Sequence, residues 1–113
     1  MNEHLKYGLP GTDIDNVISI LQKNPKVNKI VLFGSRAKGT FTNGSDVDIA
    51  LMGQELSLND ILDVSIEIEK LSLPYKFDII IYERVKEKAL TEHINRVGIV
   101  LYQRNPDTVA FYV

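Results

Sequence analysis

Two aspartates separated by one residue, Asp46 and Asp48, are the side chains whose type and spacing best suit chemistry. They open a short run of strand-forming residues, and side chains two apart in a strand project from the same face, roughly 6.5–7 Å apart at the backbone. Both carboxylates could therefore converge on one cation. By itself the pattern is weak, because Asp-x-Asp pairs arise readily by chance and acidic residues at strand ends are usually just solvated.

A third carboxylate, Asp78, lies in the apolar run from Phe77 to Tyr82. A carboxylate with so many apolar neighbours costs free energy unless something compensates its charge. Near the start of a strand it could also simply reach water. Asp78 is therefore either a functional carboxylate or a solvated residue at a strand end.

The segment from Gly34 to Thr40, with the sequence GSRAKGT, follows a predicted strand and offers free backbone N–H groups, a hydroxyl and cations, which suit a phosphate. Its spacing is not that of a Walker loop, since Lys38 precedes Gly39 and Thr40 follows directly. It also lacks the three glycines of a dinucleotide fingerprint. An ordinary strand-to-helix turn with a cap explains the segment equally well.

These residues must be positioned by helices and strands, and the predicted order of these elements indicates a small α/β (α+β) domain with a mixed β-sheet and helices packed on it. Hydrophobic periodicity and turn residues set the boundaries. The predicted elements are a helix capped by Thr12 and ending near Asn24, a strand from Val27 to Phe33, a loop or single helical turn from Ser35 to Thr40, a strand from Asp46 to Met52, a helix from Ser57 to Ser72, a strand from Phe77 to Tyr82, a helix from Lys86 to Arg96 and a strand from Ile99 to Tyr102.

The longest predicted helix begins with a capping pattern, Ser57 followed by Asp60. Its apolar residues are expected to form one broad face, made of Leu58, Ile61, Leu62, Ile68 and Leu71. At the end of the chain, the segment 109–113 is unusually apolar for a terminus and is predicted to dock on the chain's own sheet or on another chain.

Two expected strand pairings bring the candidates together. If the first two strands are antiparallel, Gly34 and Ser35 lie beside Asp46 and Asp48. If the long helix is a crossover, the strand of Asp78 runs parallel to that of the aspartate pair and starts beside it. Three carboxylates about 5 Å apart would repel by roughly 3 kcal/mol per pair at an effective dielectric constant near 20.

A bound divalent metal resolves that repulsion, and oxygen-only ligands favour Mg²⁺. Mg²⁺ held by carboxylates beside a phosphate loop is the apparatus of phosphoryl or nucleotidyl transfer. Asp78, which comes from a separate strand, is the natural group to take the proton of the incoming hydroxyl.

Composition limits the alternatives. The 113 residues predict one domain spanning 1–113, and a net charge of −2 argues against stable nucleic-acid binding. The absence of cysteine excludes thiolate metal sites, and the separated His4 and His93 make an imidazole site improbable; His93 is expected to be a partly buried surface histidine. Without an apolar signal core or membrane span, the chain is expected to be cytoplasmic.

The combination of Gly34 and Ser35, ten further residues, Asp46 and Asp48, and a later Asp78 in a hydrophobic strand resembles the signature of the nucleotidyltransferase superfamily that includes DNA polymerase β. The short length and the Gly-Ser-Arg-Ala-Lys-Gly form resemble its minimal members, the MntA-like antitoxins of prokaryotic toxin–antitoxin pairs. The similarity runs from about residue 27 to residue 82, and residues 98–102 also fit.

This resemblance implies a nucleotidyltransferase fold and a role for each motif residue. Ser35 and the Gly34 backbone would hold the triphosphate of ATP, Asp46 and Asp48 would bind two Mg²⁺ ions, Asp78 would complete the metal site and activate the acceptor, and Arg36 would steady phosphates. For Arg36 an exposed salt bridge is an equally good interpretation.

The resemblance also implies a partner, a helical HEPN-type toxin in a hetero-oligomer, with AMP passing from ATP to one of its tyrosines. The small size agrees, because the acceptor-binding surface has to come from elsewhere. One alternative is a non-catalytic antitoxin that neutralises its partner by binding and occlusion. Another is a transferase acting on RNA ends or a small hydroxyl compound, which the acidic charge and the missing acceptor domain count against.

Overall fold

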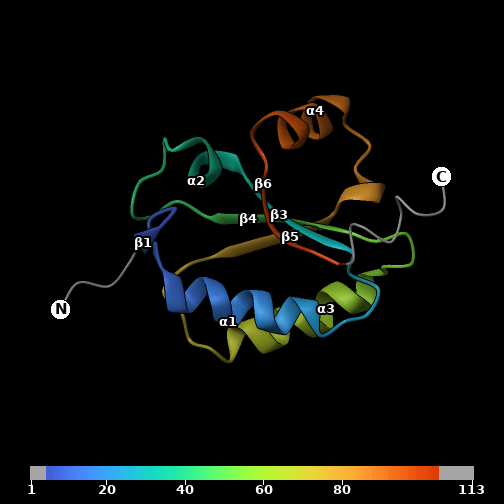
Figure 1. Ribbon diagram of the computed structural model, residues 1–113, viewed down its shortest axis with the longest axis horizontal. Helices are drawn as coiled ribbons and strands as arrows, with labels where there is room; N and C mark the ends of the chain where they lie inside the picture. Colours follow the sequence, from blue (N-terminus) through green and yellow to red (C-terminus); the bar gives the residue numbers. More distant parts are fainter. Residues whose placement is uncertain (1–4, 105–113) are drawn as a thin grey trace.

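The computed structural model describes residues 5–104, so the apolar segment 109–113, for which docking was predicted, lies outside the described residues. A four-stranded sheet forms the middle layer (Figure 1). Its order is β5-β4-β3-β6, with β3 antiparallel to both β4 and β6, and β4 parallel to β5. The strands are β3 (Lys29–Phe33), β4 (Val47–Met52), β5 (Phe77–Ile81) and β6 (Ile99–Gln103). The predicted mixed sheet and both predicted pairings are confirmed.

Helices cover both faces of the sheet. The helices α1 (Gly11–Gln22) and α3 (Leu58–Glu69) lie side by side on one face, whereas α4 (Lys88–Val97) lies on the other, with the short α2 (Gly34–Lys38) next to it at one end (Figure 1). Two features were not predicted, the hairpin of β1 (Leu5–Lys6) and β2 (Leu9–Pro10) and the 3-10 turn η1 (Tyr82–Arg84). None of the helices within residues 5–104 has the length and apolarity needed to cross a membrane.

Helix α1 begins one residue earlier than its expected cap. Pro10 occupies the N-cap position, so the prediction that Thr12 caps this helix is wrong. Pro10 is paired with Leu5 in the hairpin, and the chain passes directly from β2 into the first turn. The φ of −56° at Pro10 is the value that its ring imposes, which suits this abrupt entry into the helix.

Strand alternation divides the apolar side chains between the two faces. The main core lies toward α1 and α3, and a smaller cluster lies toward α4. Ile49 and Leu51 of β4 belong to the first group, while Ala50 belongs to the second together with Ile94 of α4. By the same alternation Asp48, two residues before Ala50, lies on the α4 face of the sheet.

The apolar residues of α3 fall into two stripes rather than the single broad face that was expected. Val64 and Ile68 are buried against the core, whereas Leu58 and Leu62 are 64% and 52% exposed and Ile66 is exposed as well. At 100° per residue, positions 58, 62 and 66 lie on one line of the helix and positions 61, 64 and 68 on another. Only the second line meets the sheet.

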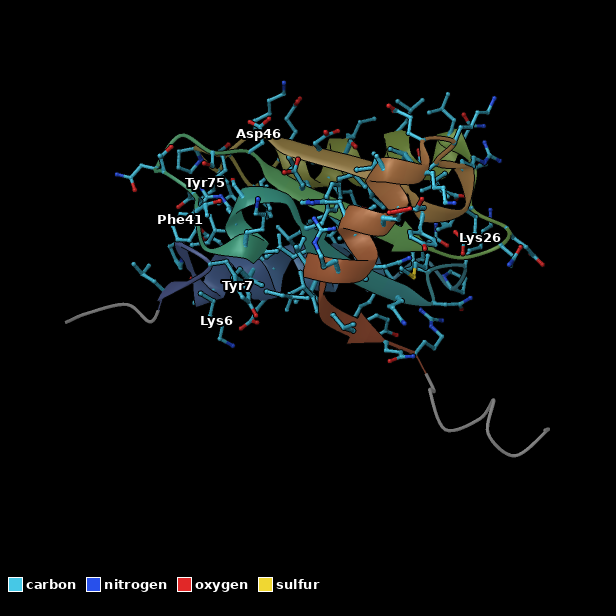
Figure 2. All side chains as sticks on the ribbon, turned by 90° about the horizontal axis from the view of Figure 1, so that it is seen from above. Lys6, Tyr7, Lys26, Phe41, Asp46 and Tyr75 are labelled. Carbon is cyan, nitrogen blue, oxygen red and sulfur yellow. The ribbon has the colours of Figure 1, made fainter. Side chains whose placement is uncertain are left out.

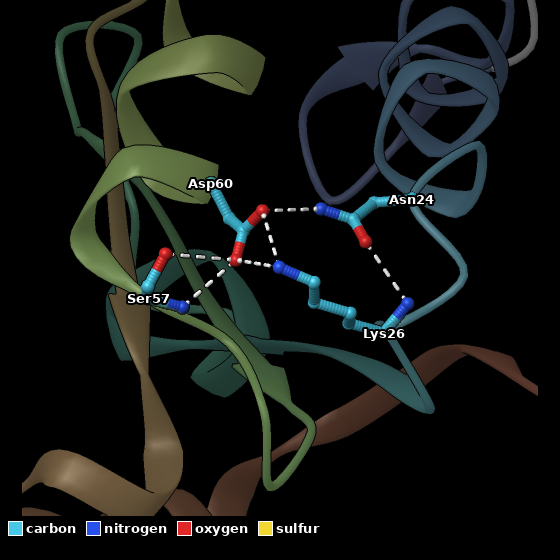
Figure 3. A network of polar contacts seen from close by, with 4 residues as sticks. All are labelled: Asn24, Lys26, Ser57 and Asp60. Carbon is cyan, nitrogen blue, oxygen red and sulfur yellow. Dashed lines mark hydrogen bonds and ion pairs between the residues drawn. The ribbon is translucent and has the colours of Figure 1, made fainter.

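The predicted capping box at the start of α3 is confirmed. Both the N–H and the hydroxyl of Ser57 donate to Asp60 Oδ2, at 2.8 and 3.1 Å, and Asn24 and Lys26 donate to the same carboxylate at 3.0 and 3.2 Å (Figure 3). These donors, led by the Ser57 N–H, lower the pKa of Asp60 to about 2. Asp60 thus joins the start of α3 to the segment between α1 and β3.

Candidate active site

Strand register places two of the predicted carboxylates next to each other. Asp48 of β4 lies directly opposite Asp78 of β5 and, across its other edge, opposite Phe33 of β3. Gly34 follows Phe33 at once, and Asp46 lies two residues before Asp48. The Gly-Ser turn and the start of β4 and β5 therefore meet at one end of the sheet, as the predicted pairings require.

The carboxylates at this end of the sheet carry the same charge and repel one another. Asp48 is half-buried, while Asp46 and Asp78 are exposed. Burial raises the pKa of Asp48, and the neighbouring Asp78 and Asp46 raise it further. Asp48 is therefore close enough to both other carboxylates to be disfavoured as an anion, which is the situation that a bound cation relieves.

The donor set fits magnesium. The three aspartates offer only oxygen, which hard cations prefer. Within residues 5–104 no three histidine or acidic side chains are gathered into a ready-made metal cage. Mg²⁺ is usually held in such sites by one or two carboxylates and takes its other ligands from water and substrate phosphates. The directly paired Asp48 and Asp78 match that requirement.

Gly34 is a position that only glycine suits. Its φ is +77°, and a Cβ added there would collide with Asp48 Oδ2. Its N–H donates to His93 Nε2 at 3.1 Å, so this amide is engaged by the protein. Ser35, the other residue predicted to hold the triphosphate, is half-buried in the first turn of α2, where its carbonyl accepts from the Gly39 N–H at 2.9 Å.

His93 is a residue that the sequence interpretation placed elsewhere. It is half-buried, as expected, but it faces the candidate site instead of the general surface. Its ring stands edge-on to Phe33, with centroids 6.1 Å apart and an interplanar angle of 80°. Helical spacing could have indicated this orientation. His93 lies on the same face of α4 as Leu90 and Val97, which both pack against the smaller core cluster.

Arg36 is 2% exposed, so its interpretation as an exposed salt bridge is wrong. Its guanidinium donates to backbone carbonyls: Nε and Nη2 to Ser45 at 3.2 and 3.0 Å, Nη1 to Tyr7 at 2.9 Å, and Nη2 to Asn43 at 3.4 Å. These bonds tie the N-terminal hairpin to the loop that leads into Asp46. Because its guanidinium is engaged by these carbonyls, Arg36 is better suited to holding this loop than to contacting a phosphate.

Aromatic rings complete the environment of Arg36. The guanidinium carbon lies 5.2 Å from the centroid of Phe41 and 5.6 Å from that of Tyr75, within the range of cation–π attraction. Figure 2 shows Tyr7, Phe41 and Tyr75 gathered at one end of the molecule, the end at which Asp46 also lies. A buried cation is thus stabilised here by carbonyls and ring faces.

A small mixed sheet with carboxylates on two adjacent strands beside a Gly-Ser turn defines a nucleotidyltransferase fold. A family model described as polymerase beta, nucleotidyltransferase matches residues 15–107. The chain therefore belongs to this nucleotidyltransferase family, and the resemblance drawn from its motif is confirmed. A search of curated proteins found no match.

Solved structures similar to this chain include toxin–antitoxin complexes. One with AMP-PNP matches at a TM-score of 0.69 and 24% identity over 88% of this chain and 86% of the other. A tri-AMPylated Shewanella oneidensis HEPN toxin in complex with MNT antitoxin matches at 0.64 and 22%, over 88% and 77%. A toxin–antitoxin structure, MntA-HepT, matches at 0.63 and 21%, over 89% and 85%. At these identities the likeness establishes a shared fold.

Proposed function

We propose that the chain is a Mg²⁺-dependent nucleotidyltransferase that transfers AMP from ATP to a tyrosine hydroxyl of a helical HEPN-type toxin, and so acts as an antitoxin. The observation that carries this proposal is the meeting of the Gly34–Ser35 turn with the paired Asp48 and Asp78 at one end of the sheet. Membership of the nucleotidyltransferase family supports it, as do similar structures with AMP-PNP and with an AMPylated HEPN toxin.

Each site residue has a role in this proposal. Ser35 binds the triphosphate, and Asp46, Asp48 and Asp78 hold the metal, two ions by the family resemblance. When bound, Mg²⁺ orients the triphosphate and neutralises its developing charge. Asp78 is exposed, so an acceptor hydroxyl can approach it and give up its proton while the oxygen bonds to the α-phosphorus and pyrophosphate leaves.

The same chemistry indicates the partner of the chain and the compartment in which it acts. The acceptor belongs to a partner protein, which implies a hetero-oligomer, and we place the pair in the cytoplasm, where ATP and Mg²⁺ are supplied. The net charge of −2 disfavours stable association with nucleic acid. Arg36 contributes by holding the loop before Asp46.

The test is a double variant, Asp46→Asn with Asp48→Asn, co-expressed with the toxin partner. Both changes keep the side-chain shape and remove metal-binding charge, so the ATP-dependent mass gain of the toxin should fall on the order of a hundredfold or more while the complex still forms. Intact-protein mass spectrometry measures the transfer, and size-exclusion chromatography checks the complex. Asp63→Asn, an exposed aspartate on α3, is the matched control.

The occlusion alternative makes the opposite prediction for the same variant. If the double variant neutralises the toxin as well as the wild type does, binding alone is the function. A second measurement addresses the nucleotide directly, by titrating the purified chain with Mg²⁺ and each nucleoside triphosphate. Failure of every nucleotide to bind would contradict the enzymatic proposal.

A further inference from the structure

His93 and Asp48 hold Gly34 from two sides. The imidazole Nε2 accepts the Gly34 N–H at 3.1 Å, and the Asp48 carboxylate occupies the space where a Cβ of residue 34 would lie. Phe33, which packs edge-on against His93, is also the cross-strand partner of Asp48. One helix-borne histidine therefore contacts the turn on both sides of the bond that joins β3 to α2.

Arg36 anchors the middle of α2 through backbone carbonyls, whereas the first residue of the turn depends on His93. Helix α2 is only five residues long, and its N-cap residue Phe33 provides no side-chain cap. The Gly34 N–H is instead satisfied by a side chain 59 residues further along the chain. Asp48 Oδ2 lies against the α-carbon of Gly34. A shift of the turn would therefore change the space that is open to the Asp48 carboxylate. Releasing this amide would thus disturb Ser35 and Asp48 together.

We propose that His93 is a positioning residue for nucleotide binding: by accepting the Gly34 N–H, it sets the place of the Ser35 hydroxyl and of the Asp48 carboxylate. This inference rests on the proposed nucleotidyltransferase function. His93 acts through Gly34 and touches no reacting atom in this scheme. Its substitution should therefore weaken the binding of the nucleotide more than it slows the transfer of a bound one.

Two variants separate the effect of the hydrogen-bond acceptor of His93 from the effect of its ring. An imidazole nitrogen that accepts a hydrogen bond carries no proton, and the amide oxygen of glutamine can take its place. His93→Gln keeps an acceptor and loses the ring, whereas His93→Phe keeps a ring against Phe33 and loses the acceptor. Glu92→Gln, at an exposed position on the same helix, is the control.

The first readout is the dissociation constant of Mg²⁺–ATP, measured by calorimetry. We expect His93→Phe to weaken binding about tenfold, equivalent to about 1.4 kcal/mol, and His93→Gln and Glu92→Gln to stay within about threefold of the wild type. In the transfer assay the loss in His93→Phe should appear in KM rather than kcat. The second readout is amide hydrogen exchange, in which Gly34 should lose protection selectively in His93→Phe.

The outcomes separate this inference from the proposed function. If the wild type binds no nucleotide, the proposed function fails and the inference fails with it. If the wild type binds and His93→Phe binds equally well, His93 has no positioning role and the proposed function is untouched. Equal weakening in both His93 variants, or faster exchange at many amides of β3 and α4, would assign His93 to packing and overturn the inference.

Discussion

At the scale of single residues, the absence of a side chain at Gly34 leaves room for the Asp48 carboxylate. The left-handed φ at this position disfavours other residues, and Gly39 shares that feature with a φ of +85°. The two glycines differ in their surroundings, because a Cβ at residue 34 would meet Asp48 while a Cβ at residue 39 has nothing within 4 Å. Backbone strain and damage to the site can therefore be told apart.

The matched pair Gly34→Ala and Gly39→Ala makes this separation measurable. Backbone strain alone should cost both variants roughly 1–2 kcal/mol of stability, because each places a Cβ in the left-handed region. Only Gly34→Ala should also displace the Asp48 carboxylate, and we expect at least a tenfold greater loss of transfer activity than in Gly39→Ala. Chemical denaturation gives the stability and the toxin mass gain gives the activity. Equal activity in the two variants would show that Asp48 has room to move.

At the scale of elements, the start of α3 is tied to the segment after α1 through one carboxylate. Four donor groups from Ser57, Asn24 and Lys26 converge on Asp60. Its pKa is about 2 in the folded chain against an ordinary value of 3.8, so the folded state binds this proton less readily than the unfolded state. The stability from this network is complete above about pH 4 and is lost as the pH falls toward 2.

The lowered pKa of Asp60 predicts how the stability of an Asp60 variant changes with pH. Asp60→Asn should be less stable than the wild type at neutral pH, because the amide removes the ion pair with Lys26 and the charged cap. The difference between the two proteins should shrink progressively from pH 4 to pH 2. Urea denaturation at a series of pH values measures it, with Asp63→Asn as the control. A difference that stays constant down to pH 2 would show that folding does not lower the pKa of Asp60.

Element patterns predicted much of this arrangement, and their limits are physical. Antiparallel pairing put the Gly34 turn beside Asp48, and the crossover rule put the strand of Asp78 alongside. The contact of His93 with Gly34 was not predictable in this way, since a hydrogen bond across 59 residues leaves no local pattern. The burial of Arg36 was equally hidden, because its acceptors are backbone carbonyls, which every sequence has.

The two stripes of α3 show a related limit. Hydrophobic periodicity states which residues share a line on the helix, but not which line meets the sheet. Leu58 and Leu62 carry the same apolar signal as Ile68, yet only Ile68 is buried. The choice depends on how α3 packs beside α1, which is a property of the assembled layers.

At the scale of the whole molecule, three like charges lie close together where β4 and β5 begin. Asp48 is held partly out of water beside two other carboxylates, and these effects raise its pKa above the ordinary value of 3.8. Its ionised form is therefore less favourable in the folded chain than in the unfolded one. In the absence of a cation, the site lowers stability at neutral pH, and this loss is relieved as the pH falls through the raised pKa of Asp48.

The variant Asp48→Asn should consequently be more stable than the wild type when no metal is present. We expect its Tm to be higher than that of the wild type at pH 7 in EDTA, with the advantage shrinking in acid as the wild-type carboxyl becomes protonated. Mg²⁺ with ATP should reverse the order, because a ligand at a hundred times its Kd adds about 2.7 kcal/mol to a protein that binds it and little to one that does not. Thermal unfolding of both proteins, with and without Mg²⁺–ATP, measures the two effects together. A lower Tm for Asp48→Asn in EDTA would contradict the raised pKa of Asp48, whereas an equal response of both proteins to Mg²⁺–ATP would show that Asp48 does not hold the ion.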